Sequence, residues 1–263
     1  MRPTRIFALL LSTLTLAGAS AFAAQAEPAP QAPHAPHVHW GYSGAHGPAH
    51  WAAVDEGFSA CSAGHEQSPI NISTQALPHA GLGDIRFDYQ TSPLNIVDNG
   101  HTIQVNYAPG SHIEVGGHRY ELVQFHFHKP SEERVNGKAY AMVAHLVHKD
   151  AEGHLAVVAV LLDKGQAKPL LQAIFDNLPQ HQGEPTAVPG VAIDLNALLP
   201  EHKGYYHFAG SLTTPPCSEG VNWFVLKEPA QASAAQIARF GRAYAHNARP
   251  VQPLNGRTVE VSE

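Results

Sequence analysis

From residue 40 onward, hydrophobic and polar positions alternate in short runs that Gly, Pro and Asn separate. Runs of this kind, rich in β-branched and aromatic residues and bounded by turn residues, predict strands of an antiparallel sheet. The clearest of them are residues 85–89, 102–107, 113–115, 120–128, 140–148 and 155–162. Turn signals lie between these runs, at residues 98–100, 109–110, 116–117 and 136–137.

Two stretches, 168–177 and 232–245, have a helical pattern instead. In the second, Ile237, Phe240 and Tyr244 recur at the spacing of one helix face. No repeat, second linker or change of composition divides residues 40–263. The pattern therefore predicts one mainly β domain of the α+β type, built on a sheet with a few short helices.

Composition narrows the classes of function. The 263 residues are 44% hydrophobic and 14% charged, which is enough chain to bury a sizeable core. Sixteen Lys and Arg against 22 Asp and Glu give a net charge of −6, so the chain does not attract nucleic acid or an anionic membrane surface. The 19 histidines outnumber Lys and Arg together. Because imidazole is the commonest metal ligand, the histidines direct the search for a site.

Residues 1–24 have the pattern of a secretory signal. Arg2 and Arg5 precede an apolar stretch at 6–17, and Ala21-Phe22-Ala23 predicts cleavage near Ala23. A membrane anchor is the alternative, but the apolar run is shorter than the about 20 residues that span a bilayer. No other segment has that length, so we expect a secreted or periplasmic protein without a membrane span. Loss of both arginines changes the charge to −6 − 2 = −8.

Residues 25–38 are rich in Pro, Ala and His and predict an extended linker before a domain at 39–263. His34, His37 and His39 could bind metal there, although solvated side chains in a mobile arm are the simpler interpretation. The only two cysteines are Cys61 and Cys217. In an oxidising compartment they predict a structural disulfide that closes a loop of 217 − 61 = 156 residues. By lowering the entropy of the unfolded chain, such a bridge stabilises the fold by up to about 5 kcal/mol.

The histidine pattern of residues 124–128 is the most informative motif. In a strand, His126 and His128 point to one face about 7 Å apart, while Phe125 and Phe127 point to the other. If residues 141–148 pair with this strand, His145 completes a group of three. Three histidines with an open fourth position are what a catalytic zinc site requires. A polar sheet face remains the alternative on this motif alone.

Several motifs then resemble the alpha-class carbonic anhydrases. They are HWGY at 39–42, QSPI at 67–70, NGH at 99–101, QFHFHKPSE at 124–132, AHLVHK at 144–149, SLTTPP at 211–216, Asn247 and RPVQPL at 249–254. The resemblance runs from about residue 39 to 257. It implies a large, mostly antiparallel twisted sheet and one Zn²⁺ per chain, bound by His126, His128 and His145 at the base of a conical cavity. The implied reaction is reversible hydration of carbon dioxide to bicarbonate and a proton by a zinc-bound hydroxide.

The resemblance also assigns the surrounding residues. Thr213 matches the gatekeeper threonine, which is hydrogen-bonded to Glu132. His101 matches the proton shuttle, although an exposed turn histidine would look identical in sequence. Thr214 is expected to line the polar side of the cavity, and Tyr42 to order the connecting water. The apolar substrate pocket falls on residues that would otherwise be read as ordinary core, namely Val147, Val157, Leu212, Val221 and Trp223.

Metal-bound histidines usually donate their second N–H to a fixed acceptor. Gln124 is expected to accept from His126, and the backbone carbonyl of Asn247 from His128. For the third histidine, the family commonly uses a glutamate two residues earlier, where this chain has Val143. The position after Glu132, often histidine in the family, is Glu133. We therefore hypothesise that Glu133 replaces the missing carboxylate.

Two other functions remain to be weighed. A catalytically silent relative that only binds a ligand would keep the fold, but loss of a zinc ligand would mark it, and all three histidines are present. A different zinc hydrolase would need a motif such as HExxH or a nucleophile elbow, which the sequence lacks. Weak esterase side activity is expected from an open zinc site. Related bacterial enzymes are often dimers, so a homodimer is a family expectation.

Overall fold

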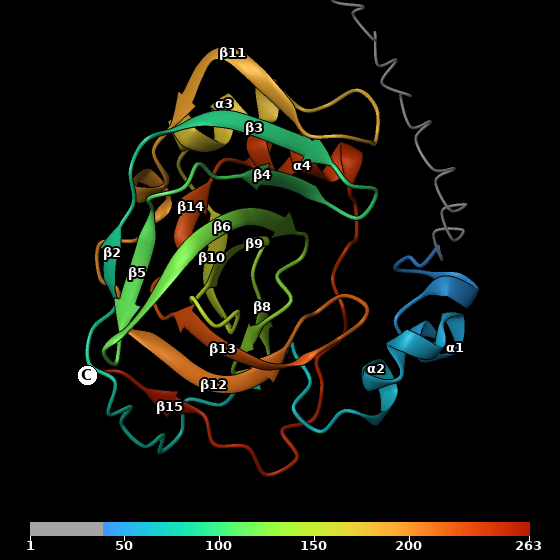
Figure 1. Ribbon diagram of the computed structural model, residues 1–263, viewed down its shortest axis with the longest axis vertical. Helices are drawn as coiled ribbons and strands as arrows, with labels where there is room; N and C mark the ends of the chain where they lie inside the picture. Colours follow the sequence, from blue (N-terminus) through green and yellow to red (C-terminus); the bar gives the residue numbers. More distant parts are fainter. Residues whose placement is uncertain (1–38) are drawn as a thin grey trace, which may run out of the picture. The chain divides into compact units, whose positions relative to one another are not determined.

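A computed structural model describes residues 39–263 (Figure 1). The predicted signal segment and linker, with His34 and His37, lie outside the described residues. The described part forms one mainly β domain, as the sequence pattern predicts, and its central sheet has 12 strands. Among these residues, no helix is long and apolar enough to cross a membrane.

The central sheet is mixed but mostly antiparallel. Its strand order is β11-β3-β4-β6-β9-β10-β13-β12-β15, with β5 and β2 extending from β6 and with β14 beside β10. Only the pairs β10–β13 and β10–β14 are parallel in the described sheet. Its strands are β2 (Arg86–Asp88), β3 (Ser92–Asp98), β4 (Ile103–Asn106), β5 (His112–Val115), β6 (His118–His128), β9 (Met142–Lys149), β10 (Leu155–Lys164), β11 (Thr186–Ile193), β12 (Tyr205–Ser211), β13 (Glu219–Leu226), β14 (Ala230–Ala232) and β15 (Glu260–Val261).

A small second sheet and short helices complete the domain. The second sheet has the order β1-β7-β8. Its strands are β1 (Asn71–Ile72), β7 (Arg134–Val135) and β8 (Lys138–Ala139), and the α-helices are α1 (Trp51–Val54), α2 (Ala60–Ala63), α3 (Pro169–Asp176) and α4 (Ala234–Ala243). Single 3₁₀ turns lie at Gly44–His46, Glu56–Phe58 and Leu195–Leu198. Helices α3 and α4 begin and end within two residues of the helices predicted from the sequence.

Strand alternation separates the core from the site. On β6, Phe125 and Phe127 point to the face that α3 and α4 cover, where Phe127 packs edge-on against Phe175 and Phe240 at 5.4 and 5.9 Å between ring centroids. The intervening residues of β6 point to the opposite face. In the register of β6 and β9, His126 lies directly opposite His145. The fold thereby brings histidines from two neighbouring strands to one side of the sheet.

Candidate metal centre

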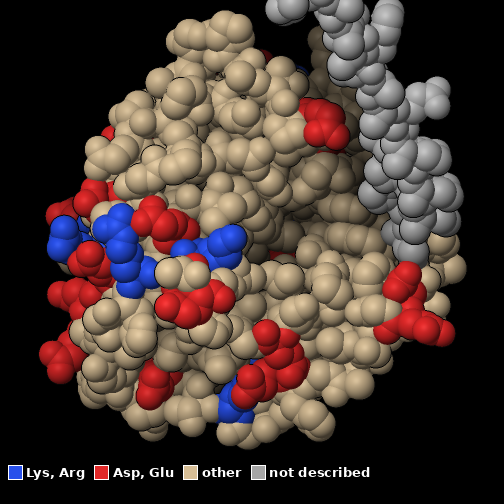
Figure 2. All heavy atoms as spheres, in the orientation of Figure 1, with Lys and Arg blue, Asp and Glu red and all other residues tan. Residues whose placement is uncertain are grey.

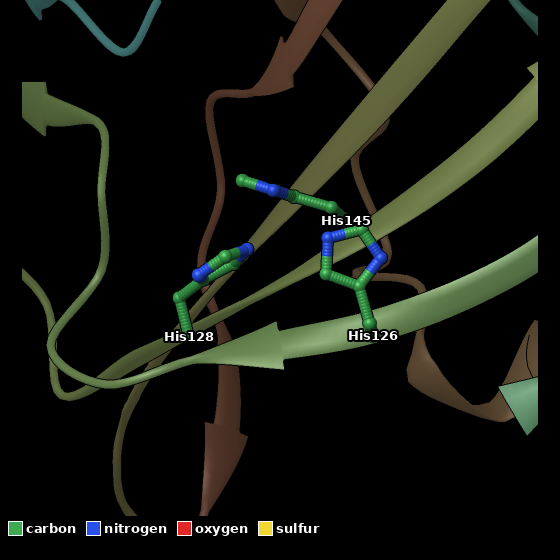
Figure 3. Close-up of side chains that lie close together, drawn as sticks. All are labelled: His126, His128 and His145. Atoms are coloured by element: carbon green, nitrogen blue, oxygen red, sulfur yellow. The ribbon is translucent and has the colours of Figure 1, made fainter. Parts of the chain in front are cut away.

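Three histidines converge on one side of the β6–β9 pair. Figure 3 shows their rings facing a common space, His126 and His128 from β6 and His145 from β9. One ring nitrogen of each lies within 4.8 Å of the other two. His128 and His145 are buried, and His126 is partly exposed. This is the triad that the sequence predicted.

The two histidines of β6 each donate one ring N–H to a fixed oxygen. Nδ1 of His126 donates to Oε1 of Gln124 at 2.9 Å, and Nδ1 of His128 donates to the backbone oxygen of Asn247 at 2.7 Å. Because these oxygens accept the N–H, both rings have their proton on Nδ1. Their Nε2 atoms are therefore left as lone-pair donors that face the common space.

His145 has the opposite arrangement. Its Nε2–H donates to both carboxylate oxygens of Glu133, each at 3.1 Å. The lone pair of this ring is therefore on Nδ1. The side chain of Glu133 is fully buried, and Val143 lies buried two residues before His145 on the same strand. Glu133 thus makes the contact that the sequence hypothesis assigns to it.

The donor set fits a metal ion. Nε2 of His128 is buried and has no hydrogen-bond partner among the described residues, an arrangement that ordinarily costs about 1–3 kcal/mol. Burial lowers the pKa of His126 to about 3 and that of His128 well below its usual value, so both rings are neutral. Burial also lowers the pKa of His145, but the charges of Glu133 and Glu132 outweigh it and raise that pKa overall. Neutral nitrogens aimed at one point are what a zinc site needs.

A second carboxylate lies beside the triad. Oε1 of Glu132 accepts the backbone N–H of Arg249 at 2.7 Å, and its Oε2 is 3.8 Å from Nδ1 of His145. Burial raises the pKa of Glu132 to about 7. Thr213 lies beside it and its hydroxyl helps to lower that pKa, although Oε2 makes no hydrogen bond of full geometry within residues 39–263. The predicted gatekeeper pair is therefore adjacent in space.

The triad lies in a cavity of about 250 Å³. Val147, Val157, Leu212 and Trp223 form an apolar wall, and the polar side carries Asn99, His101, Gln104, Gln124 and Thr214. Figure 2 shows a recess on this face of the molecule that is bordered mainly by residues other than Lys, Arg, Asp and Glu. The predicted pocket residue Val221 belongs to the same buried apolar cluster as Val157 and Trp223, but it is not among the described residues that line the cavity.

Aromatic residues from the start of the domain flank the cavity. The ring of His101 stacks on Trp40, with centroids 3.6 Å apart and planes 5° from parallel. Burial lowers the pKa of His101, and nearby His39 adds to this effect. The hydroxyl of Tyr42 is buried and unpaired within the described chain, and burial raises its pKa well above the usual value. Trp40 was not singled out in the sequence, where only the HWGY motif pointed to it.

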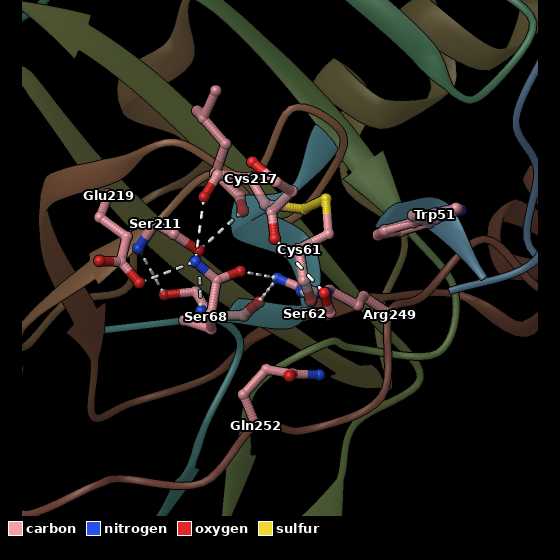
Figure 4. Close-up of a disulfide and its surroundings, with 12 residues drawn as sticks. Trp51, Cys61, Ser62, Ser68, Ser211, Cys217, Glu219, Arg249 and Gln252 are labelled. Carbon is pink, nitrogen blue, oxygen red and sulfur yellow. Dashed lines mark hydrogen bonds between the residues drawn. A yellow bond between two sulfur atoms is a disulfide. The ribbon is translucent and has the colours of Figure 1, made fainter. Parts of the chain in front are cut away.

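The predicted disulfide joins Cys61 of α2 to Cys217, with Cα atoms 5.0 Å apart (Figure 4). The buried guanidinium of Arg249 lies next to it and donates to the backbone oxygens of Cys61 at 2.9 Å and Ser68 at 2.7 Å. Burial lowers the pKa of Arg249 to about 10, so it stays charged at neutral pH. Sequence analysis assigned Arg249 no role beyond its place in the RPVQPL motif.

The disulfide also adjoins the polar side of the cavity. The backbone N–H of Cys217 donates to the backbone oxygen of Thr214 at 2.9 Å, and Gln67 Nε2 donates to the backbone oxygen of Cys217 at 3.0 Å. Through the backbone of Arg249, the same network holds Glu132. The bridge and the site therefore share one set of buried contacts.

Comparison with known proteins identifies the family. The family model for eukaryotic-type carbonic anhydrase matches residues 46–263, nearly all of the described domain. The chain belongs to the eukaryotic-type, or alpha-class, carbonic anhydrases. A carbonic anhydrase of Klebsiella pneumoniae is 48% identical over 224 residues, which cover 84% of this chain and 90% of that protein. A carbonic anhydrase of Neisseria gonorrhoeae is 42% identical over 251 residues, or 95% of each chain.

A solved structure gives the same assignment. The alpha-carbonic anhydrase of Thermovibrio ammonificans, in complex with the inhibitor sulfanilamide, superposes with a TM-score of 0.81 at 42% identity. The match covers 85% of this chain and 99% of that one. The fold expected from the resemblance is therefore correct.

Proposed function

We propose that this carbonic anhydrase catalyses the reversible, zinc-dependent hydration of carbon dioxide to bicarbonate and a proton. The observation that carries the proposal is the convergence of three histidine ring nitrogens, with each ring fixed by its own acceptor, inside a cavity with one apolar wall. Zn²⁺ would be held by Nε2 of His126, Nε2 of His128 and Nδ1 of His145. When bound, zinc acts as a Lewis acid that lowers the pKa of its water to about 7, a value known from carbonic anhydrases themselves.

Thr213 and Glu132 orient the attacking oxygen. The backbone N–H of Arg249 holds one oxygen of Glu132 in place and leaves the other oxygen to accept a hydrogen bond from the hydroxyl of Thr213. The threonine oxygen can then only accept, which fixes one hydrogen-bond direction at the base of the cavity. Restricting the reacting oxygen in this way lowers the barrier by removing unproductive orientations.

The apolar wall provides the substrate site. Carbon dioxide has no net charge and no hydrogen-bond donor. It therefore binds by apolar contact with the wall, which consists of Val147, Val157, Leu212 and Trp223. Val221 supports this wall from within the same buried cluster as Val157 and Trp223. Thr214 lies on the polar side, where it hydrogen-bonds the charged product.

His101 carries the proton out of the cavity, with Tyr42 ordering water between them. Its lowered pKa keeps the ring neutral at neutral pH, so it can accept a proton. In His101→Ala, hydration in dilute buffer is expected to fall on the order of tenfold or more, and added imidazole should restore it. Stopped-flow hydration over a range of buffer concentrations measures this. His202→Ala, which removes an exposed surface histidine, is the control. Unchanged rates in dilute buffer for His101→Ala would exclude the shuttle.

We propose that the protein is exported, with its signal segment cleaved near Ala23, and that it acts as a secreted or periplasmic protein. The bridged pair Cys61 and Cys217 supports it, because such bonds persist in oxidising compartments.

Zinc content and hydration of one purified sample test the proposed function. We expect one zinc per chain, loss of hydration after chelation, and recovery when zinc is added back. Stopped-flow carbon dioxide hydration and metal analysis give both readouts. Stoichiometric zinc without hydration would instead favour a catalytically silent binding module.

A further inference from the structure

The orientation of His145 depends on a residue outside its own strand. Its Nε2–H is buried and needs an acceptor, and the described residues supply one side chain, the carboxylate of Glu133 at 3.1 Å from each oxygen. Glu132 is also near this ring, but its Oε2 is 3.8 Å from the opposite nitrogen, Nδ1. The two adjacent glutamates therefore face different sides of one imidazole.

Strand β9 itself offers no acceptor for this ring. Position 143 is on the same face as His145, because residues two apart in a strand point the same way. It carries Val143, which is fully buried opposite His128 and packs in an apolar cluster with Leu161 and Trp223. A valine side chain has no polar atom, so the acceptor has to come from another segment.

Several hydrogen bonds hold the segment that carries Glu133. The hydroxyl of Ser131 donates to the backbone oxygen of Glu133 at 2.8 Å, and the backbone N–H of Tyr140 donates to that same hydroxyl at 2.8 Å. One residue further on, the backbone N–H of Arg134 donates to the oxygen of Ile70, where β7 joins β1. The small second sheet thereby fixes the backbone from which the carboxylate extends.

We propose that Glu133 is the positioning residue of the metal centre, holding His145 with its proton on Nε2 so that Nδ1 faces the zinc. The proposal rests on the proposed zinc site and adds the group that fixes the orientation of its third ligand, His145. A charged acceptor stabilises the Nε2–H form and makes Nδ1 a stronger donor to the metal. Loss of such a partner typically weakens metal binding or activity by 10- to 100-fold.

Zinc release tests this without reference to catalysis. Zinc-loaded wild type, Glu133→Gln and Glu133→Leu are mixed with excess chelator, and the release rate is followed with a metal-sensitive dye. Gln keeps an acceptor but loses the charge, whereas Leu loses both. We expect release about 10-fold faster for Gln and about 100-fold faster for Leu. Release from both variants within threefold of wild type would overturn the proposal.

Glu132→Gln is the matched control, since it makes the same change at the adjacent buried residue. Because it leaves the acceptor of the His145 Nε2–H in place, we expect it to lower hydration and to speed zinc release less than Glu133→Gln does. The double variant Glu133→Gln/Val143→Glu returns a carboxylate to the face of His145, and slower release than in Glu133→Gln alone would further support the role. A wild type that binds no zinc would instead count against the proposed function.

A second measurement needs no variant. In zinc-free wild type with ¹⁵N-labelled histidine, NMR at alkaline pH reports which ring nitrogen carries the proton. We expect His145 to be protonated on Nε2 and His126 and His128 on Nδ1. A proton on Nδ1 of His145 would overturn the proposal, and this result does not depend on whether the variants fold.

Discussion

Replacing His128 with alanine is expected to eliminate stoichiometric zinc binding and to reduce hydration to the level of the zinc-free protein. The ring is fully buried, its Nε2 has no partner in the described chain, and its Nδ1–H is fixed by the carbonyl of Asn247. Without it, two nitrogen ligands remain, fewer than the three protein ligands of a catalytic zinc site. Metal analysis and stopped-flow hydration measure the two losses.

His148→Ala is the control for this variant. Like His128, His148 is a fully buried histidine, but it belongs to β9 and burial lowers its pKa to about 3. It lies on the other face of the sheet, where its Nε2 is 2.9 Å from the hydroxyl of Tyr89. Its loss should reduce stability and leave one zinc per chain. A His128→Ala protein that keeps both its zinc and its hydration rate would refute the proposed metal centre.

Removing the disulfide is expected to produce the largest loss of stability. For Cys61→Ser/Cys217→Ser, the free energy of unfolding should fall by up to about 5 kcal/mol, because the bridge closes a 156-residue separation and restricts the unfolded chain. Denaturant unfolding of the zinc-free proteins measures the difference.

The same variant has a second expected effect. Because the N–H of Cys217 holds the backbone of Thr214, hydration should also fall in the still-folded variant. The wild type unfolded in the presence of a reductant is the control and should behave like the double serine variant. Equal unfolding free energies for the oxidised wild type and the variant would contradict the stabilising role of the bridge.

The sequence predicted local elements well where the pattern was regular. The run at 120–128 lies within β6, and the spacing of Ile237 and Phe240 correctly predicted the face of α4 that packs on the core, with Tyr244 just after the helix. Strands β3, β11, β12 and β13 were not among the predicted runs. Both β3 and β11 contain a proline, Pro93 or Pro189, and β11 also has an irregular register against β3, so neither shows clean alternation.

The site also has residues that a local pattern predicts and residues that it does not. Two of its ligands are two residues apart in one strand, so strand geometry alone placed His126 and His128 on one face. The partners of those ligands come from distant segments. Asn247 is 119 residues from His128, and Arg249 is 188 residues from Cys61, so no local pattern shows that they meet. The hypothesis about Glu133 came from comparing two positions with the family, which is a signal that one strand pattern does not contain.

The contacts of Asn247 and Arg249 also bear on the order in which the centre is assembled. The three histidines lie near the middle of the chain, but the groups that fix His128 and Glu132 follow more than 100 residues later, at residues 247 and 249. A chain that emerges with its N-terminus first therefore exposes its histidines well before the last two supports are present. Such long-range contacts also form slowly in folding. We therefore expect tight metal capture only once residues 247 and 249 have been synthesised and packed against the histidines.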